Sequence, residues 1–322
     1  MGKRAGGGRG AAAVTGAALG VAAGAALGAY VLAPDGGITI GGATAEERAE
    51  ARLAAEHAEG RAAVADEVLT TVQDDIIGGR LRDAPTVLLV APDADPADVA
   101  AVAEALRTAG APDGGRLELT AAALSADRAD ALGDVIAGAL PAGASLDEAR
   151  TTPGRHTGQA LASALLLDDR GGERATAEDR ELLLGSLREA GFVDYEDGTL
   201  RPSAAIVVVA GRGTADGEPG AAGEFGAGVL AETAAALRAE GGAVVLAGRP
   251  AAADEGGAAA ALAEVPDGDR VDAVAAIGDA AGRILVINDL RNQLDAAPAA
   301  RPAPAGEPAG QPDGEPAEEP AN

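Results

Sequence analysis

The chain has 322 residues, with 25 Lys and Arg against 51 Asp and Glu, which gives a net charge of −26. Such an acidic protein is not expected to bind nucleic acid, because phosphate binding requires a basic surface. The chain contains no Cys, so disulfides, thiolate metal sites and a Cys nucleophile are excluded. Aromatic residues make up 1% of the chain, too few for the aromatic girdles of an outer-membrane barrel.

The first 33 residues have the pattern of a membrane anchor. Residues 1–10 carry three basic residues and no acid, and residues 11–33 carry no charge. As a helix, residues 11–33 would extend about 34 Å, enough to cross a hydrocarbon layer of roughly 30 Å. The positive flank predicts a single anchor with the body of the protein outside the cytoplasm. A cleaved signal peptide and a cytosolic protein remain alternatives.

The anchor contains a regular series of glycines. A spacing of four places them on one face of a helix, where they permit close helix–helix approach. We therefore expect a homo-oligomer that forms through a face made of Gly16, Gly20, Gly24 and Gly28.

A linker over residues 34–43 and a helical, coiled-coil-like stalk over residues 44–80 are expected next. Within the stalk, apolar residues recur mostly at spacings of four, namely Leu53, Val64, Val68, Val72 and Ile76. His57 lies on or near this stripe; we interpret it as a surface or partly buried side chain rather than a metal ligand.

The body, residues 81–295, alternates short β-branched runs with Ala-rich amphipathic segments. Near-continuous apolar runs are typical of parallel strands covered on both faces, and they occur at Thr86–Ala91, Leu117–Thr120, Ala205–Ala210, Ala243–Ala247 and Val271–Ala276. Helices are expected at Pro96–Ala109, Ala126–Leu140, Thr157–Leu167, Thr176–Ala190, Gly223–Ala239, Gly256–Ala263 and Asp279–Leu294. The order predicts an α/β fold with a doubly wound, mostly parallel sheet.

Two stretches are less regular. Residues 141–195 show two helices and no clear strand, so they either cover the sheet or separate two subdomains. Residues 296–322 hold seven of the 18 prolines together with five acids, a composition that predicts a disordered tail.

A ligand site in a doubly wound sheet is expected beyond the carboxyl ends of the strands. The residues there with suitable chemistry are Asp93, Arg212, Arg249 and Asp279. Arginine can bind a carboxylate or phosphate through paired hydrogen bonds, and aspartate can accept hydrogen bonds from hydroxyl groups or bind a hard cation. Structural pairing among these residues is an equal alternative.

Motifs for enzyme chemistry are absent from the sequence. Gly211-Arg212-Gly213 follows a strand, but Asp216 occupies the position of the third glycine of a dinucleotide fingerprint. The only lysine, Lys3, precedes the anchor, so a phosphate-binding loop is excluded. His156 is interpreted as a polar neighbour of a helix start. We predict neither an enzyme nor a resident cofactor.

Six collinear segments resemble the mycobacterial copper transport protein B (MctB) family. They are Leu140–Leu146, Thr157–Leu166, Leu187–Tyr195, Ala205–Val209, Val244–Arg249 and Ala281–Ile287. The resemblance implies copper efflux or copper tolerance, with copper as the transported substrate, and a place in the outer membrane of an actinobacterial envelope. The alternatives are an anchored scaffold that affects copper tolerance indirectly and an envelope enzyme or ligand-binding module.

Overall fold

The computed structural model describes residues 45–211 and 223–296. The expected anchor with its glycine face, the linker and the C-terminal tail lie outside these residues. Among the described helices, none combines the length and the apolarity required to span a membrane.

The body is built on one six-stranded sheet. The strands are β1 (Thr86–Val90), β2 (Asp113–Leu119), β3 (Val193–Tyr195), β4 (Ala205–Val209), β5 (Ala243–Ala247) and β6 (Asp272–Val274). They lie in the order β3-β2-β1-β4-β5-β6 and are parallel except for β3, which runs antiparallel to β2 at the edge. The predicted α/β class with a mostly parallel sheet is confirmed.

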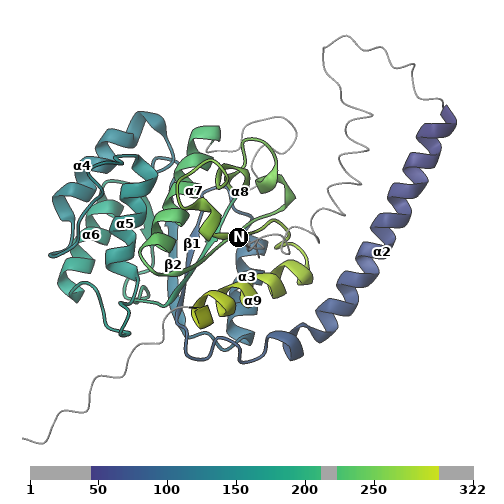
Figure 1. Ribbon diagram of the computed structural model, residues 1–322, viewed down its shortest axis with the longest axis horizontal. Coiled ribbons are helices and arrows are strands. Elements are labelled where there is room, and N and C mark those ends of the chain that lie inside the picture. Colours follow the sequence, from purple (N-terminus) through teal and green to yellow (C-terminus); the bar gives the residue numbers. More distant parts are fainter. Residues whose placement is uncertain (1–44, 212–222, 297–322) are drawn as a thin grey trace, which may run out of the picture.

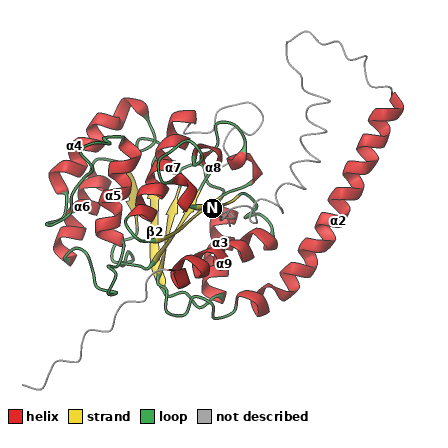
Figure 2. Ribbon diagram, viewed as in Figure 1, coloured by secondary structure: helices red, strands yellow, loops and turns green. Residues whose placement is uncertain are grey.

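Helices cover both faces of the sheet (Figure 2). One face carries α4 (Ala129–Ala139), α5 (Pro153–Leu165), α6 (Ala177–Glu189), α7 (Gly223–Ala239) and the short α8 (Ala258–Ala261). The other face carries α3 (Pro96–Thr108), α9 (Ala280–Ala296) and the C-terminal end of α2 (Ala45–Ile77).

The two-sided cover explains the uninterrupted apolar strands. In β1, Val87 and Leu89 point into the cluster under α4–α7, whereas Leu88 and Val90 point into the cluster under α3 and α9. All five residues of β1, β4 and β5 are buried for the same reason.

The central stretch, residues 141–195, covers the sheet rather than separating two subdomains. Its helices α5 and α6 pack with α4 and α7 on a single face. Helix α5 begins at Pro153, four residues before the expected Thr157, because proline is favoured in the first turn of a helix.

The close packing of α5 on α7 depends on glycine. A Cβ on Gly158 would lie 2.5 Å from Ala236 Cβ and 2.6 Å from the carbonyl oxygen of Thr233. One turn earlier, the carbonyl of Gly154 accepts a hydrogen bond from the Thr233 hydroxyl at 3.1 Å. The two helices therefore approach each other at backbone distance.

Two strand predictions were wrong in detail. β2 begins at Asp113 rather than Leu117, since Gly114 and Gly115 continue the strand instead of forming a turn. At Gly114 a side chain would overlap the Ser203 hydroxyl, so glycine is required for close approach within the sheet. β3 was not predicted, because three residues are too short to show a period.

Helix α2 projects from the body and reaches it only near its C-terminal end (Figure 1). The Asp66 carboxylate accepts a hydrogen bond from the backbone N–H of Ala280 at 2.6 Å, so α2 caps the N-terminus of α9. Gln73 Oε1 accepts from Arg283 Nε at 3.3 Å, and Ile77 is fully buried. The expected stalk is thus a helix whose C-terminal half is fixed to the body.

Candidate functional site

The carboxyl edge of the sheet contains a topological switch point between β1 and β4. The chain leaves β1 for α3 on one face and leaves β4 toward α7 on the other face. In doubly wound sheets such a divergence opens a crevice in which ligands bind. The segment after Ala91 and the residue Gly211 lie at this switch point.

Asp93 occupies the switch point. Its carboxylate lies so close to Gly211 that a Cβ on Gly211 would overlap it. Burial raises the pKa of Asp93, because desolvation disfavours the charged carboxylate. A half-buried carboxyl at this position can accept a hydrogen bond from a hydroxyl group when it is ionised, and it can donate its proton when it is neutral.

Arg249, at the end of β5, is engaged by the start of α3. Its Nε donates to Asp98 Oδ2 at 2.6 Å and its Nη2 to Asp98 Oδ1 at 3.1 Å. The same Nη2 donates to Asp95 Oδ2 at 3.1 Å. The side-chain hydrogen bond to Asp98 raises the pKa of Arg249.

The pairing of Arg249 is therefore structural. Asp98 is 6% exposed, and its bidentate partner compensates the burial of its charge. Asp95 also accepts from Ala97 N at 3.0 Å and caps α3. Asp95 and Asp98 were not predicted as site residues, although an aspartate before a proline and another in the first helical turn are signals of a helix start.

The four predicted site residues are not all brought together. Asp93 and Arg249 lie at the same edge, but Arg249 binds Asp95 and Asp98 instead of Asp93. Asp279 is exposed at the entrance of α9, and Arg212 lies outside the described residues.

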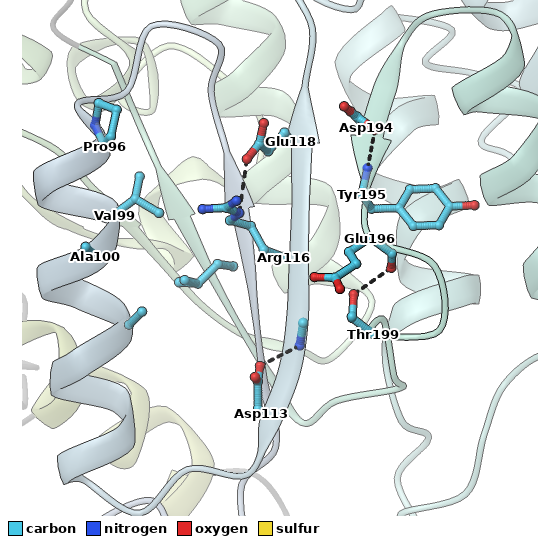
Figure 3. Close-up of a pocket in the computed structure, with 13 residues that line it drawn as sticks. Pro96, Val99, Ala100, Asp113, Arg116, Glu118, Asp194, Tyr195, Glu196 and Thr199 are labelled. Atoms are coloured by element: carbon cyan, nitrogen blue, oxygen red, sulfur yellow. Dashed lines mark hydrogen bonds and ion pairs between the residues drawn. The ribbon is translucent and has the colours of Figure 1, made fainter.

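A groove of about 590 Å³ lies between α3, β2 and the edge strand β3 (Figure 3). Arg116 and Glu118 on β2 form an ion pair in it at 3.0 Å. Four carboxylates and this single arginine line the groove, the acids being Asp113, Glu118, Asp194 and Glu196. The groove is an acidic, largely solvent-exposed surface.

The two histidines stand apart. His57 is exposed on α2, whereas His156 lies in the first turn of α5 with Nε2 3.2 Å from the carbonyl oxygen of Asp147. Asp147 also accepts from Arg155 Nε at 2.9 Å, so His156 belongs to a polar network that fixes the loop before α5. Across residues 45–211 and 223–296, no three His, Cys, Asp or Glu side chains are grouped closely enough to hold a metal ion.

These features define a doubly wound α/β body with a projecting N-terminal helix and an acidic surface. The chain matches the family described as "Copper transport outer membrane protein, MctB" over residues 8–300 and belongs to that family. Proteins named "Copper transporter MctB" from Mycobacterium bovis and Mycobacterium tuberculosis are 32% identical to it over 181 residues. That alignment covers 55% of this chain, and the chain spans about half the length of these relatives, 56%.

Proposed function

We propose that the chain acts in copper efflux and copper tolerance in the actinobacterial cell envelope. Membership of the MctB family over residues 8–300 carries this proposal, and the mycobacterial relatives are named copper transporters. The role proposed is that of a transport component, with copper as substrate and no catalytic step or resident cofactor.

The arrangement proposed is an N-terminal anchor over residues 11–33 with the body outside the cytoplasm, in the outer membrane as the family description indicates. Chains assemble through the face formed by Gly16, Gly20, Gly24 and Gly28. A single span encloses no path by itself, so transport requires this assembly.

The body is proposed to attract copper rather than to bind it tightly. The sequence holds no Cys, one Met and two His, few of the soft and imidazole ligands that copper prefers. Its net charge of −26 supports a negative surface potential that raises the local concentration of cations. The groove beside Arg116 is one such acidic surface.

A second candidate function is a ligand-binding module at the switch point. The observation that favours it is Asp93, whose half-buried carboxyl lies beside Gly211 at the switch point between β1 and β4. Asp93→Asn keeps the size of the side chain and removes its charge. A loss of function in this variant without unfolding would favour the module.

Cellular copper content under copper stress tests the proposal. A deletion strain is complemented with the full chain, with Asp93→Asn, and with a chain that lacks residues 11–33 but is exported by an unrelated signal. We expect raised copper in the deletion strain and rescue by the full chain and Asp93→Asn only. Unchanged copper in the deletion strain would refute the copper role.

Transport and scaffolding are separated with purified full chain in liposomes. Copper flux across the liposome membrane is the result expected of a transport component. A copper-sensitive deletion strain combined with no flux would instead support an anchored scaffold that acts indirectly.

A further inference from the structure

Helix α2 has two separate faces. The face turned to the body carries Asp66, Gln73 and Ile77, which contact α9 or are buried. A second face carries large aliphatic side chains that are 36% to 63% exposed, namely Leu53, Val64, Val68, Val72 and Ile76. At about 100° per residue these five lie within roughly 140° of one another. Leu53, Val64 and Val68 lie away from the docked residues, and Ile76 borders Leu69, which packs on the body.

The exposed stripe is long and narrow. From Leu53 to Ile76 it extends about 35 Å at about 1.5 Å per residue, and it is about one helix wide, roughly 10 Å. A strip of this shape is complementary to another helix with the same pattern of ridges.

The charges within the stripe select the partner and its direction. Arg61 and Asp75 lie on the same face as the valines, seven residues before and seven residues after Val68. Neither forms an ion pair within residues 45–211 and 223–296. Parallel pairing in register would place Arg61 beside Arg61 and Asp75 beside Asp75, which is repulsive.

Antiparallel pairing about Val68 gives the stripe residues between positions 60 and 76 a complementary partner, whereas Leu53 lies beyond this overlap. Val68 meets Val68, Val64 meets Val72, and Arg61 meets Asp75 of the second copy. Gly60 then faces Ile76, and Gly60 has open space on its own chain to accept that larger side chain. We propose that the exposed stripe of α2 is an isologous dimer interface at which a second copy of this chain binds in the antiparallel direction.

The contact is separate from the glycine face of the anchor. Antiparallel pairing places the two Ala45 ends about 70 Å apart, at about 1.5 Å per residue over the 23 residues on either side of Val68. The overlap, residues 60–76, is about 25 Å long. It buries less than the roughly 1,200 Å² of stable complexes, so the dimer is reversible.

The absence of native Cys permits a direct test in the full-length protein. Under mild oxidation, we expect a disulfide-linked dimer from Val68→Cys alone. Val64→Cys and Val72→Cys should give a linked heterodimer when mixed and little product when separate. Ala63→Cys, exposed on the opposite side of α2, is the matched control.

Each alternative gives a distinct pattern. Cross-linking of Val64→Cys to itself would overturn the antiparallel register in favour of a parallel one. Equal yields from Val68→Cys and Ala63→Cys would overturn the interface. The substitutions lie on exposed positions, so loss of the fold does not explain either result.

Charge exchange is an independent test by sedimentation velocity of the full chain. Arg61→Glu should weaken the dimer roughly ten-fold, because two symmetry-related attractions become repulsions. Arg61→Glu combined with Asp75→Arg should restore the affinity to within about two-fold. No restoration would contradict this register, and none of these outcomes depends on whether the protein transports copper.

Discussion

Replacing Gly158 with alanine should destabilise the body by separating α5 from α7. The new Cβ would lie 2.5 Å from Ala236 Cβ and 2.6 Å from the Thr233 carbonyl oxygen, about 1 Å inside ordinary contact. Overpacking of this kind costs about 1–3 kcal/mol. Separation of the helices also strains the Thr233–Gly154 hydrogen bond, which contributes about 1 kcal/mol.

The opposing effect is the higher helix propensity of alanine, about 1 kcal/mol in a helix interior. We therefore expect Gly158→Ala to lower the free energy of unfolding by about 1–3 kcal/mol. Gly185→Ala in α6 is the matched control, since a Cβ there has no neighbour within 4 Å. The control should raise the free energy of unfolding by up to about 1 kcal/mol.

Urea denaturation of both full-length variants, followed by circular dichroism, measures the difference. Opposite signs for the same chemical change would establish that Gly158 is required by the helix crossing. Equal stabilisation by the two alanines would refute the backbone-distance packing of α5 on α7.

Three further predictions concern the elements around α9. Burial and the neighbouring Asp272 raise the pKa of Asp289 to about 6. Between pH 4 and 6 the Asp289 carboxyl is therefore protonated in the folded state and ionised in the unfolded state. The free energy of unfolding should fall as the pH rises through this range and then level off. Asp289→Asn should remove this pH dependence and raise the free energy of unfolding at pH 7.5 by about 1 kcal/mol, a value reduced for solvent screening at this partly exposed site. Urea denaturation at pH 4 and 7.5 measures the change. Asp66→Ala should remove the cap on Ala280 and increase hydrogen exchange at the start of α9, while α2 remains helical by circular dichroism. The side-chain amide of Gln293 accepts a hydrogen bond from Val244 N and donates one to Val244 O, both at 2.8 Å, as the backbone of a neighbouring strand would. Gln293→Leu should lower the melting temperature, because it leaves the buried backbone N–H and C=O of Val244 without these partners.

The sequence predicted the central strands well because their apolar runs have a single interpretation. β1, β4 and β5 are buried on both faces, so apolar residues follow one another along each strand instead of alternating with polar ones. Helix ends were also predictable where a glycine follows the helix, because the chain takes a positive φ there. Gly110, Gly191 and Gly241 all have positive φ just beyond a helix.

The candidate site was less predictable, because it depends on which side chains tertiary packing brings together. Composition and position identified Arg249 as a residue at a strand end. Nothing local indicated that it would bind Asp98, which is 151 residues away in the chain. The same applies to Asp66, whose partner Ala280 is 214 residues away. Long-range hydrogen bonds leave no periodic trace in a sequence.

The stripe of α2 illustrates the limit of periodicity most clearly. The spacing of four predicted a helical, coiled-coil-like stalk and did not indicate which face of the helix contacts the body. The structure fixes α2 through another face, by way of Asp66, Gln73 and Ile77, and leaves Val64 and Val68 more than half exposed. Exposed aliphatic residues at regular spacing on a helix that is already docked are the pattern of an association surface. Because the spacing of Arg61 and Asp75 about Val68 is symmetric, the chain itself provides the complementary partner.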